Sequence, residues 1–417
     1  MSTAAAAARP QDVKVIGLVS AAHFMSHFYQ LVLPSLFPLL KVTFGVDYAE
    51  LGVVMTLMYA TSALMQTPAG MLVDRLGATR VLIGGLGLYA SAVTLYGLAP
   101  NIWVLGLLAV VAGFGNCVFH PSDYAIMTAR VGANRLGRAY GVHNLGGSFG
   151  WVAAPISVLA LTSLFGWRAA LSILGGVGLA LTLYLIVERA ALKTEGRTRQ
   201  RRSEPARERA PLPIILSRPI LLCFGYYLLL AVATAGLQPF LPSSLVAAWG
   251  LSFAVANSAL TGFLIGSSAG IFAGGVAADR FARHEIIVAI GLTSAGVLAL
   301  VIGFLPMPVP PLVLCVAAAG FAVGTTTPSR DMLVRRAAPS GATGKVFGFV
   351  YSGLDLGSAV TPPFLGLLID HQLPRLVFVA VAAAMFLAIS TAVVVGSQSA
   401  GDSRERGRRG AAAASQP

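Results

Sequence analysis

The sequence predicts an all-α integral membrane protein with twelve transmembrane helices, arranged as two pseudo-symmetric bundles of six. Three observations predict this fold class: the composition, the spacing of apolar segments, and a repeat that relates the two halves of the chain. Of 417 residues, 56% are hydrophobic and only 11% are charged, whereas about a quarter of the residues in a typical soluble domain are charged. This composition excludes a soluble enzyme.

Twelve apolar segments follow one another with short connections, and each is long enough to cross a hydrocarbon core of about 30 Å as a helix. Backbone groups find no water in that core, so only helices or closed barrels can span it. The segments lack the two-residue alternation of barrel strands, which leaves helices. The predicted spans are 15–40, 51–73, 81–99, 102–129, 138–161, 167–188, 219–246, 255–278, 285–305, 311–334, 344–368 and 375–396.

The basic residues are distributed unevenly between the two ends of these spans. With a cytoplasmic N-terminus, 25 of the 29 Lys and Arg residues fall in cytoplasmic segments, three in outer loops (Lys41, Arg168, Arg375), and Arg330 inside a span. This excess follows the positive-inside rule and predicts that both termini are cytoplasmic. It also explains the net charge of +13 without a nucleic-acid partner.

The apolar segments and the charge distribution together predict the domain organisation. A polar, basic stretch in the middle of the chain suits a linker, and a basic, low-complexity tail is expected to be disordered. The predicted parts are an N-terminal tail 1–14, a first bundle 15–189, a linker 190–218, a second bundle 219–396 and a tail 397–417. The three cysteines lie far apart in apolar runs, so we expect neither a disulfide framework nor a metal site.

The two halves repeat one another at a nearly constant offset of 205 to 208 residues. GMLVDR at 70–75 recurs as GVAADR at 275–280, Pro121-Ser122 recurs as Pro328-Ser329, and Leu33-Pro34-Ser35 recurs as Leu241-Pro242-Ser243. Parallel repeats of six spans are a known architecture of transporters.

The connection after the second span carries a glycine, an Asp-Arg pair, a second glycine and a basic residue, in the positions Gly70, Asp74, Arg75, Gly77 and Arg80. This segment resembles the loop signature of the major facilitator superfamily, and the resemblance covers about residues 13–396. The second copy keeps Gly275, Asp279 and Arg280 but has Ala282 in place of the later glycine. The resemblance implies a cytoplasmic gate at both loops, whereas a surface turn is the simpler alternative.

Several motifs of the first half are similar to the fosmidomycin-resistance group of exporters. They are His23-Phe24, Tyr29-Gln30, Pro38-Leu39-Leu40 and Phe119-His120-Pro121. The acid that follows His-Pro in that group stands one position later here, as Asp123. The fifth span also resembles the antiporter signature of exporters, although close packing through small residues would leave the same pattern; its residues are Gly141, Gly150, Ala154 and Pro155.

Ionisable residues inside spans cost about 2.5–3.5 kcal/mol when charged, so they are expected to face a cavity or to pair. His23 and His27 lie four apart on one helix face, and their repeat equivalents are alanines, so they are not shared scaffold. Asp123 and Arg330 are related by the repeat and either face a common cavity or pair structurally. The candidates for proton coupling or substrate binding are His23, His27, Tyr29, Gln30, His120, Asp123, Arg330, Asp331 and Asp355.

These observations predict a secondary transporter in a bacterial-type inner membrane that works by alternating access. The resemblance favours proton-coupled efflux of a small drug-like compound or metabolite. A proton-coupled importer and a transporter-like sensor without flux are the alternatives. No nucleotide-binding or zinc motif is present in the sequence, so we expect no enzymatic activity, no cofactor and no metal. The expected partners are a small-molecule substrate, protons and the lipid bilayer, with a functional monomer.

Overall fold

The computed structural model describes residues 10–132, 135–193, 217–281, 283–337 and 343–414. Every regular element in these ranges is a helix, and none is a strand. The chain divides into two compact units, unit 1 (residues 1–207) and unit 2 (residues 208–417). The predicted all-α membrane fold is confirmed. Most of the predicted linker 190–218, residues 1–9 of the N-terminal tail and the end of the C-terminal tail lie outside the described residues.

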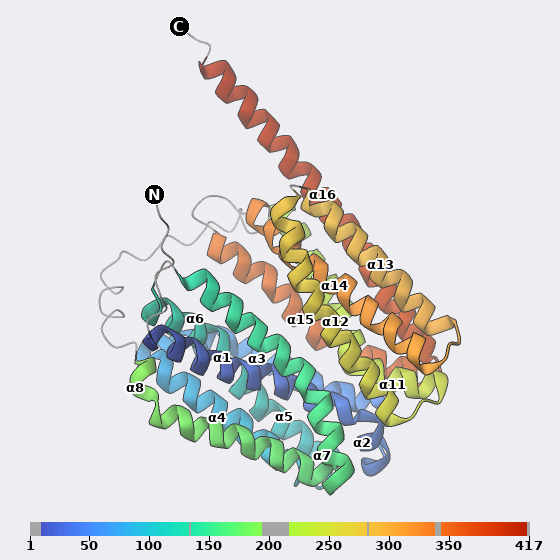
Figure 1. Ribbon diagram of the computed structural model, residues 1–417. Coiled ribbons are helices and arrows are strands. Elements are labelled where there is room, and N and C mark those ends of the chain that lie inside the picture. The colour runs from blue at the N-terminus through green and yellow to red at the C-terminus, as the bar shows by residue number, and fades with distance from the viewer. Residues whose placement is uncertain (1–9, 133–134, 194–216, 282, 338–342, 415–417) are drawn as a thin grey trace. The chain divides into compact units, whose positions relative to one another are not determined.

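Unit 1 contains the helices of the first six predicted spans (Figure 1). Two of these spans are interrupted: the first by a 3-10 turn at Pro34, and the fourth at Cys117 and Val118. The elements are α1 (Pro10–Val32), η1 (Pro34–Leu36), α2 (Phe37–Phe44), α3 (Tyr48–Leu76), α4 (Ala78–Tyr96), α5 (Ile102–Asn116), α6 (Phe119–Arg130), α7 (Leu136–Val187) and α8 (Arg189–Leu192).

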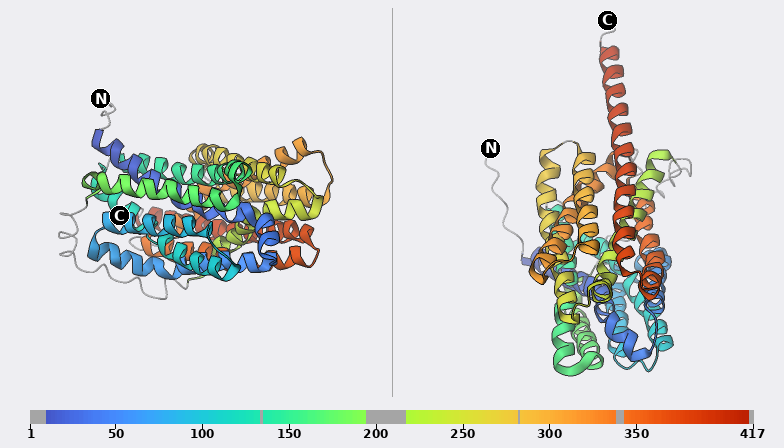
Figure 2. Two further views of the ribbon diagram at one scale, coloured as in Figure 1. Left: turned by 90° about the horizontal axis from the view of Figure 1, so that it is seen from below. Right: turned by 90° about the vertical axis from the view of Figure 1, so that its right-hand side faces the viewer.

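Unit 2 contains the helices of the last six predicted spans, and its long helices are uninterrupted (Figure 2). Pro239 and Pro242 lie inside α11, although the repeat relates Pro242 to Pro34, where the first span breaks. The elements are α11 (Arg218–Trp249), α12 (Phe253–Arg280), α13 (His284–Phe304), α14 (Val309–Ala337), α15 (Thr343–Asp370) and α16 (Pro374–Ala414).

Eleven helical segments of the described chain are long and apolar enough to cross a membrane. The twelfth span is contained in α7, whose 52 residues would extend about 78 Å as one straight helix, more than twice the hydrocarbon thickness. The helix breaks at Gly166, which adopts φ 78° and ψ 159°, a backbone conformation that is essentially restricted to glycine. Spans five and six therefore meet at a single residue.

Large apolar side chains are exposed along the helices, for example Trp103 at 80% and Leu314 at 70%. A soluble monomer rarely exposes such surfaces over all its helices, whereas lipid tails cover them in a membrane. The chain is therefore a multi-pass membrane protein.

The C-terminal helix α16 continues past the predicted span end at residue 396 as far as Ala414. Disorder is the sequence-based expectation for this tail, and the structure differs. The segment is rich in alanine and arginine, which are among the best helix formers, so the helix continues without a break.

Candidate functional site

Three helices of unit 1 bring four histidines and one aspartate together. His23 and His27 come from α1, His120 and Asp123 from α6, and His143 from α7. We call these five residues the histidine cluster. Sequence analysis selected four of them, and the structure adds His143.

The centre of the histidine cluster is Asp123, whose side chain is fully buried. Its Oδ2 atom lies 3.4 Å from His23 Nδ1 and 3.7 Å from His143 Nε2. The rings of His23 and His143 are stacked with centroids 3.8 Å apart, and His27 lies 4.3 Å from His23. His120 is exposed, with its ring centroid 5.7 Å from that of His23.

The polar atoms at this centre lack hydrogen bonds to the described residues. This holds for both carboxylate oxygens of Asp123, for Nδ1 of His23 and for both ring nitrogens of His143. The Asp123 contacts are within ion-pair range but are longer than an ordinary hydrogen bond of about 2.7–3.2 Å. Buried polar groups are rarely left unpaired, because each costs about 1–3 kcal/mol. Such a concentration of unpaired groups makes the histidine cluster the candidate functional site of this unit.

The packing of α1 against α7 holds the imidazoles in place. A Cβ atom at Gly147 would lie 2.9 Å from ring atoms of both His23 and His27, so only glycine leaves them room. One turn further along α7, the Trp151 ring centroid lies 4.2 Å from that of His27. Trp151 Nε1 donates a 3.0 Å hydrogen bond to Gln30 Oε1, which fixes the tryptophan relative to α1.

A hydrogen-bonded chain links three helices one turn from the cluster. Ser26 Oγ donates to Asn116 Oδ1 at 3.0 Å, and Asn116 Nδ2 donates to Ser62 Oγ at 2.9 Å. These bonds connect α1, α5 and α3. Asn116 is the last residue of α5, so the interruption of the fourth span is held at a fixed position relative to His23 and His27.

The cluster does not have the geometry of a metal centre. Its three ligand-type atoms, from His23, Asp123 and His143, lie within 4.8 Å of one another. Tetrahedral zinc with bonds of about 2.0–2.1 Å would hold its ligand atoms about 3.3 Å apart. The rings of His23 and His143 are stacked and inclined by 24°, so their in-plane lone pairs lie in nearly parallel planes. This geometry suits proton sharing better than metal coordination.

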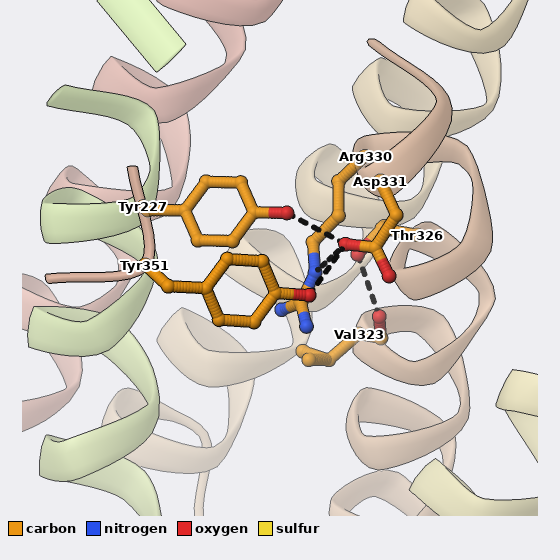
Figure 3. Close-up of polar contacts among 6 residues, drawn as sticks. All are labelled: Tyr227, Val323, Thr326, Arg330, Asp331 and Tyr351. Atoms are coloured by element: carbon orange, nitrogen blue, oxygen red, sulfur yellow. Dashed lines mark hydrogen bonds and ion pairs between the residues drawn. The ribbon is translucent and has the colours of Figure 1, made fainter. Parts of the chain in front are cut away.

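A second polar cluster lies in unit 2 and contains Arg330 and Asp331 from α14, Tyr227 from α11 and Tyr351 from α15 (Figure 3). We call it the arginine–tyrosine cluster. Arg330 Nε donates to Asp331 Oδ1 at 3.2 Å, and the same oxygen accepts from Tyr227 at 2.6 Å and from Tyr351 at 3.3 Å. The two charges, adjacent in sequence, therefore pair locally.

Asp355 and Tyr29 join neither cluster. Asp355 is half-buried on α15 and makes no hydrogen bond or ion pair with the described residues. Tyr29 is buried and donates to the Leu174 and Gly175 carbonyl oxygens, while its ring contacts Tyr89. These contacts give Tyr29 a structural position between α1, α4 and α7.

The predicted gate residues lie at helix ends. Gly77, with φ 88°, separates α3 from α4, and Asp279-Arg280 ends α12. Asp74 and Asp279 are exposed and form no ion pair with residues that the structure describes. Their role as a gate stays a prediction.

The antiporter-like segment of α7 faces α1 at one of its glycines. A Cβ atom at Gly150 would overlap the Phe24 carbonyl oxygen, whereas Gly141 has nothing within 4 Å. Ala154 and Pro155 are buried. Close packing thus accounts for Gly150, and its neighbour Gly147 serves the histidines.

The site residues that were not among the sequence-based candidates are His143, Asn116, Tyr227 and Tyr351. Their roles arise from contacts between helices, and neither the repeat nor helical spacing marks them. The exception is His143, since an ionisable residue inside a span is a signal by itself.

Comparison with known proteins agrees with the fold and with the motifs. The family model of the Major Facilitator Superfamily matches residues 19–243 and 223–416. The chain is 25% identical to the fosmidomycin resistance protein of Escherichia coli (strain K12), over 87% of this chain and 88% of that protein. It is 27% identical to the multidrug resistance protein MdtG of Serratia proteamaculans (strain 568), over 81% and 82% of the two chains.

A solved structure with the same fold is that of a bacterial homologue of the human lysosomal transporter Spinster, in an inward-facing and unoccupied conformation. Its TM-score is 0.79 at 16% identity, with 95% of this chain and 99% of that chain covered. Because the family model spans nearly the whole chain, this protein is a member of the major facilitator superfamily, a transporter and not an enzyme.

Proposed function

We propose that this transporter exports a small drug-like compound or metabolite in exchange for protons, and that the histidine cluster is the proton-coupling site. The observation that carries this proposal is the buried Asp123 carboxylate, which lies between the imidazoles of His23 and His143. Neither carboxylate oxygen accepts a hydrogen bond from the described residues, and the facing ring nitrogens of the two histidines make none. A single proton placed between Asp123 and either histidine would supply the missing hydrogen bond.

The chemistry of the cluster suits a proton that arrives and leaves during a cycle. Imidazole changes charge near physiological pH, with an ordinary pKa of about 6.5. Removing the proton leaves a buried carboxylate without a donor, which is costly. A conformational change that alters the spacing of α1, α6 and α7 would therefore change proton affinity, and this dependence is what couples proton movement to alternating access.

The direction of transport is inferred from the relatives. Two of the similar proteins are named for resistance to drugs, and resistance transporters work by removal of the compound from the cell. We place the protein in the bacterial inner membrane with both termini cytoplasmic, because of the basic residues on one side of the spans, and we expect it to function as a monomer.

The test is flux in proteoliposomes under an imposed proton gradient of either sign, with fosmidomycin as the first probe because of the resemblance to the E. coli protein. For an exporter, proton influx into the lumen drives release of preloaded probe. Asp123→Asn keeps the shape but cannot bind the proton. We expect it to abolish gradient-driven flux while probe exchange without a gradient persists.

Three outcomes separate the alternatives. Accumulation of probe together with protons would identify an importer, and the absence of any flux with normal ligand binding would favour a sensor. Full gradient-driven flux in Asp123→Asn would remove the histidine cluster from the coupling mechanism. His371→Gln, at an exposed histidine outside the cluster, is the matched control.

A further inference from the structure

Among the residues that the structure describes, the Arg330 guanidinium finds a hydrogen-bond partner for only one of its three nitrogens. Nε donates to Asp331 Oδ1, whereas Nη1 and Nη2 make no hydrogen bond with any residue that the structure describes. Arginine–carboxylate pairs are frequently bidentate, with two parallel N–H···O bonds. Here the pair is monodentate, so the outer edge of the guanidinium, with up to four N–H donors, is available.

Aromatic rings surround this guanidinium. The Tyr227 ring lies 5.1 Å from the guanidinium carbon, within cation–π range, and the Tyr351 ring centroid is 5.0 Å from that of Tyr227. Figure 3 shows both rings extending from one side toward Arg330 and Asp331. The Tyr227 ring covers one face of the guanidinium, and its edge stays the direction from which a hydrogen-bonding group can approach.

The site combines a buried base with an accessible rim. The Arg330 side chain is 17% exposed, whereas Asp331 is 38% exposed and Tyr351 is also exposed. A small pocket adjoins Arg330, lined by Cys223, Tyr226, Leu333, Val334 and Ala392, with room for about one water molecule. The Tyr226 hydroxyl is buried beside this pocket. Together these groups offer hydrogen-bond donors beside an apolar wall.

We propose that Arg330 binds the oxyanion head of a small organic anion, a carboxylate or phosphonate, whose short apolar body packs against the tyrosines. The planar donor edge of arginine matches such oxygens in a way that lysine does not. The inference deepens the proposed function, since it rests on that transport activity to make the bound anion a substrate.

Asp331 has a defined part in this site. Its carboxylate is paired with the Arg330 guanidinium and partly neutralises the positive charge. Asp331 therefore competes with an incoming anion and keeps the anion affinity moderate. Removing the charge of Asp331 should therefore strengthen anion binding. If the Arg330–Asp331 pair were purely structural, loss of either partner would lower the stability of the protein and would not raise its affinity for anions.

The experiment measures equilibrium binding to the full-length protein in detergent by calorimetry, without a proton gradient. The probes are benzoate and phenylphosphonate, with benzamide as the neutral control of the same shape as benzoate. We expect both anions to bind and benzamide to bind at least about tenfold more weakly. Arg330→Gln should lose anion binding by a similar factor, and Arg330→Lys should recover only part of it.

The isosteric variant Asp331→Asn keeps an oxygen acceptor for the tyrosines and is expected to raise anion affinity several-fold. The matched control is Arg375→Gln, because Arg375 also lies over an aromatic ring, that of Trp249 at 4.7 Å, and its loss should change nothing. Equal binding of benzoate and benzamide, or unchanged anion affinity in both Arg330→Gln and Asp331→Asn, would overturn the proposal.

This binding assay separates the two proposals. If anions bind at Arg330 but Asp123→Asn retains gradient-driven flux, the anion site stands and proton coupling fails. If no anion binds while Asp123→Asn loses coupling, the coupling site stands and Arg330 is not a substrate ligand. Should Arg330→Gln fail to fold, the affinity change in Asp331→Asn still decides the question.

Discussion

At the scale of single residues, His143 shows how a contact can change the interpretation of a motif. Sequence analysis focused on His23 and His27, because a spacing of four places them on one helix face. The structure stacks His143 on His23 and brings both to Asp123. The candidate site therefore depends on the Asp123 carboxylate, which lies between the imidazoles of His23 and His143 from two different helices. The His23–His27 pair on α1 is only one part of this site.

We expect His143→Gln to reduce gradient-driven flux at least about tenfold, because glutamine can hydrogen-bond but cannot carry the proton. Flux should also depend less steeply on pH, because the variant lacks one of the titratable groups of the cluster. The measurement is a pH series of initial rates in proteoliposomes. Unaltered rates and pH profile in His143→Gln would exclude this residue from the coupling step.

The sequence could predict these ionisable residues but not their partners. An acid or a histidine inside an apolar span is conspicuous, because the membrane makes it costly. That Asp123 meets His143 within its own unit depends on how α6 and α7 pack. Tyr227 and Tyr351 give no signal at all, since tyrosine is common in transmembrane helices.

At the scale of helices, the contact between α1 and α7 depends on small residues that serve different purposes. Gly150 allows the α1 backbone to approach, Gly147 leaves space for two imidazoles, and Gly141 has open space. The antiporter-like pattern in the sequence marks Gly141 and Gly150 alike. Only the structure distinguishes them, because the difference lies in what faces each glycine.

Gly147→Ala, Gly141→Ala and Gly150→Ala form a matched series. Alanine in a helix is favoured over glycine by about 0.5–1 kcal/mol, so Gly141→Ala should be neutral or stabilising. Gly150→Ala meets backbone and should lower thermal stability the most, since overpacking costs about 1–3 kcal/mol or more. Gly147→Ala should fold but displace the imidazoles and impair coupling.

Thermal unfolding in detergent and gradient-driven flux test this series together. Coupling in Gly147→Ala equal to that in Gly141→Ala would show that the imidazoles tolerate displacement, and would argue against a finely positioned cluster.

The positions of the helices were predictable from the sequence, but their interruptions were not. Apolar length alone defined the spans, because the bilayer sets it. The break at Pro34 and the continuous helix at the related Pro242 have the same local sequence, Leu-Pro-Ser. Their different outcomes are decided by neighbouring helices, which can stabilise a proline inside a transmembrane helix or leave it to end one.

At the scale of the whole molecule, duplication explains why the fold was predictable while the sites were not. Matching residues recur in both halves where the scaffold needs them, as at Asp74 and Asp279. The two polar clusters differ between the halves, with histidines in unit 1 and an arginine with tyrosines in unit 2. Repeats thus identify shared architecture, and departures from the repeat mark the candidate functional positions.

For the gate, we expect Asp74→Asn to insert and fold normally but to transport at least about tenfold more slowly. The reason is that a carboxylate at a helix end can stabilise one conformation through nearby helix termini and arginines, so its loss shifts the conformational equilibrium. Substrate affinity at equilibrium should change less than the rate. Asp74→Glu, which keeps the charge, should retain more activity, and wild-type rates in Asp74→Asn would exclude the gate.

The single-residue break at Gly166 has a practical consequence for anyone who probes this protein. The other connections at the same ends of the unit 1 helices are residues 45–47 and 97–101, so this face has almost no irregular chain. A protease has little to cleave there, and an antibody has few linear epitopes to bind. An epitope tag or fluorescent fusion placed on this face of unit 1 would have to fit into one of these short connections or interrupt a helix, so a reporter there carries a high risk of disturbing the fold.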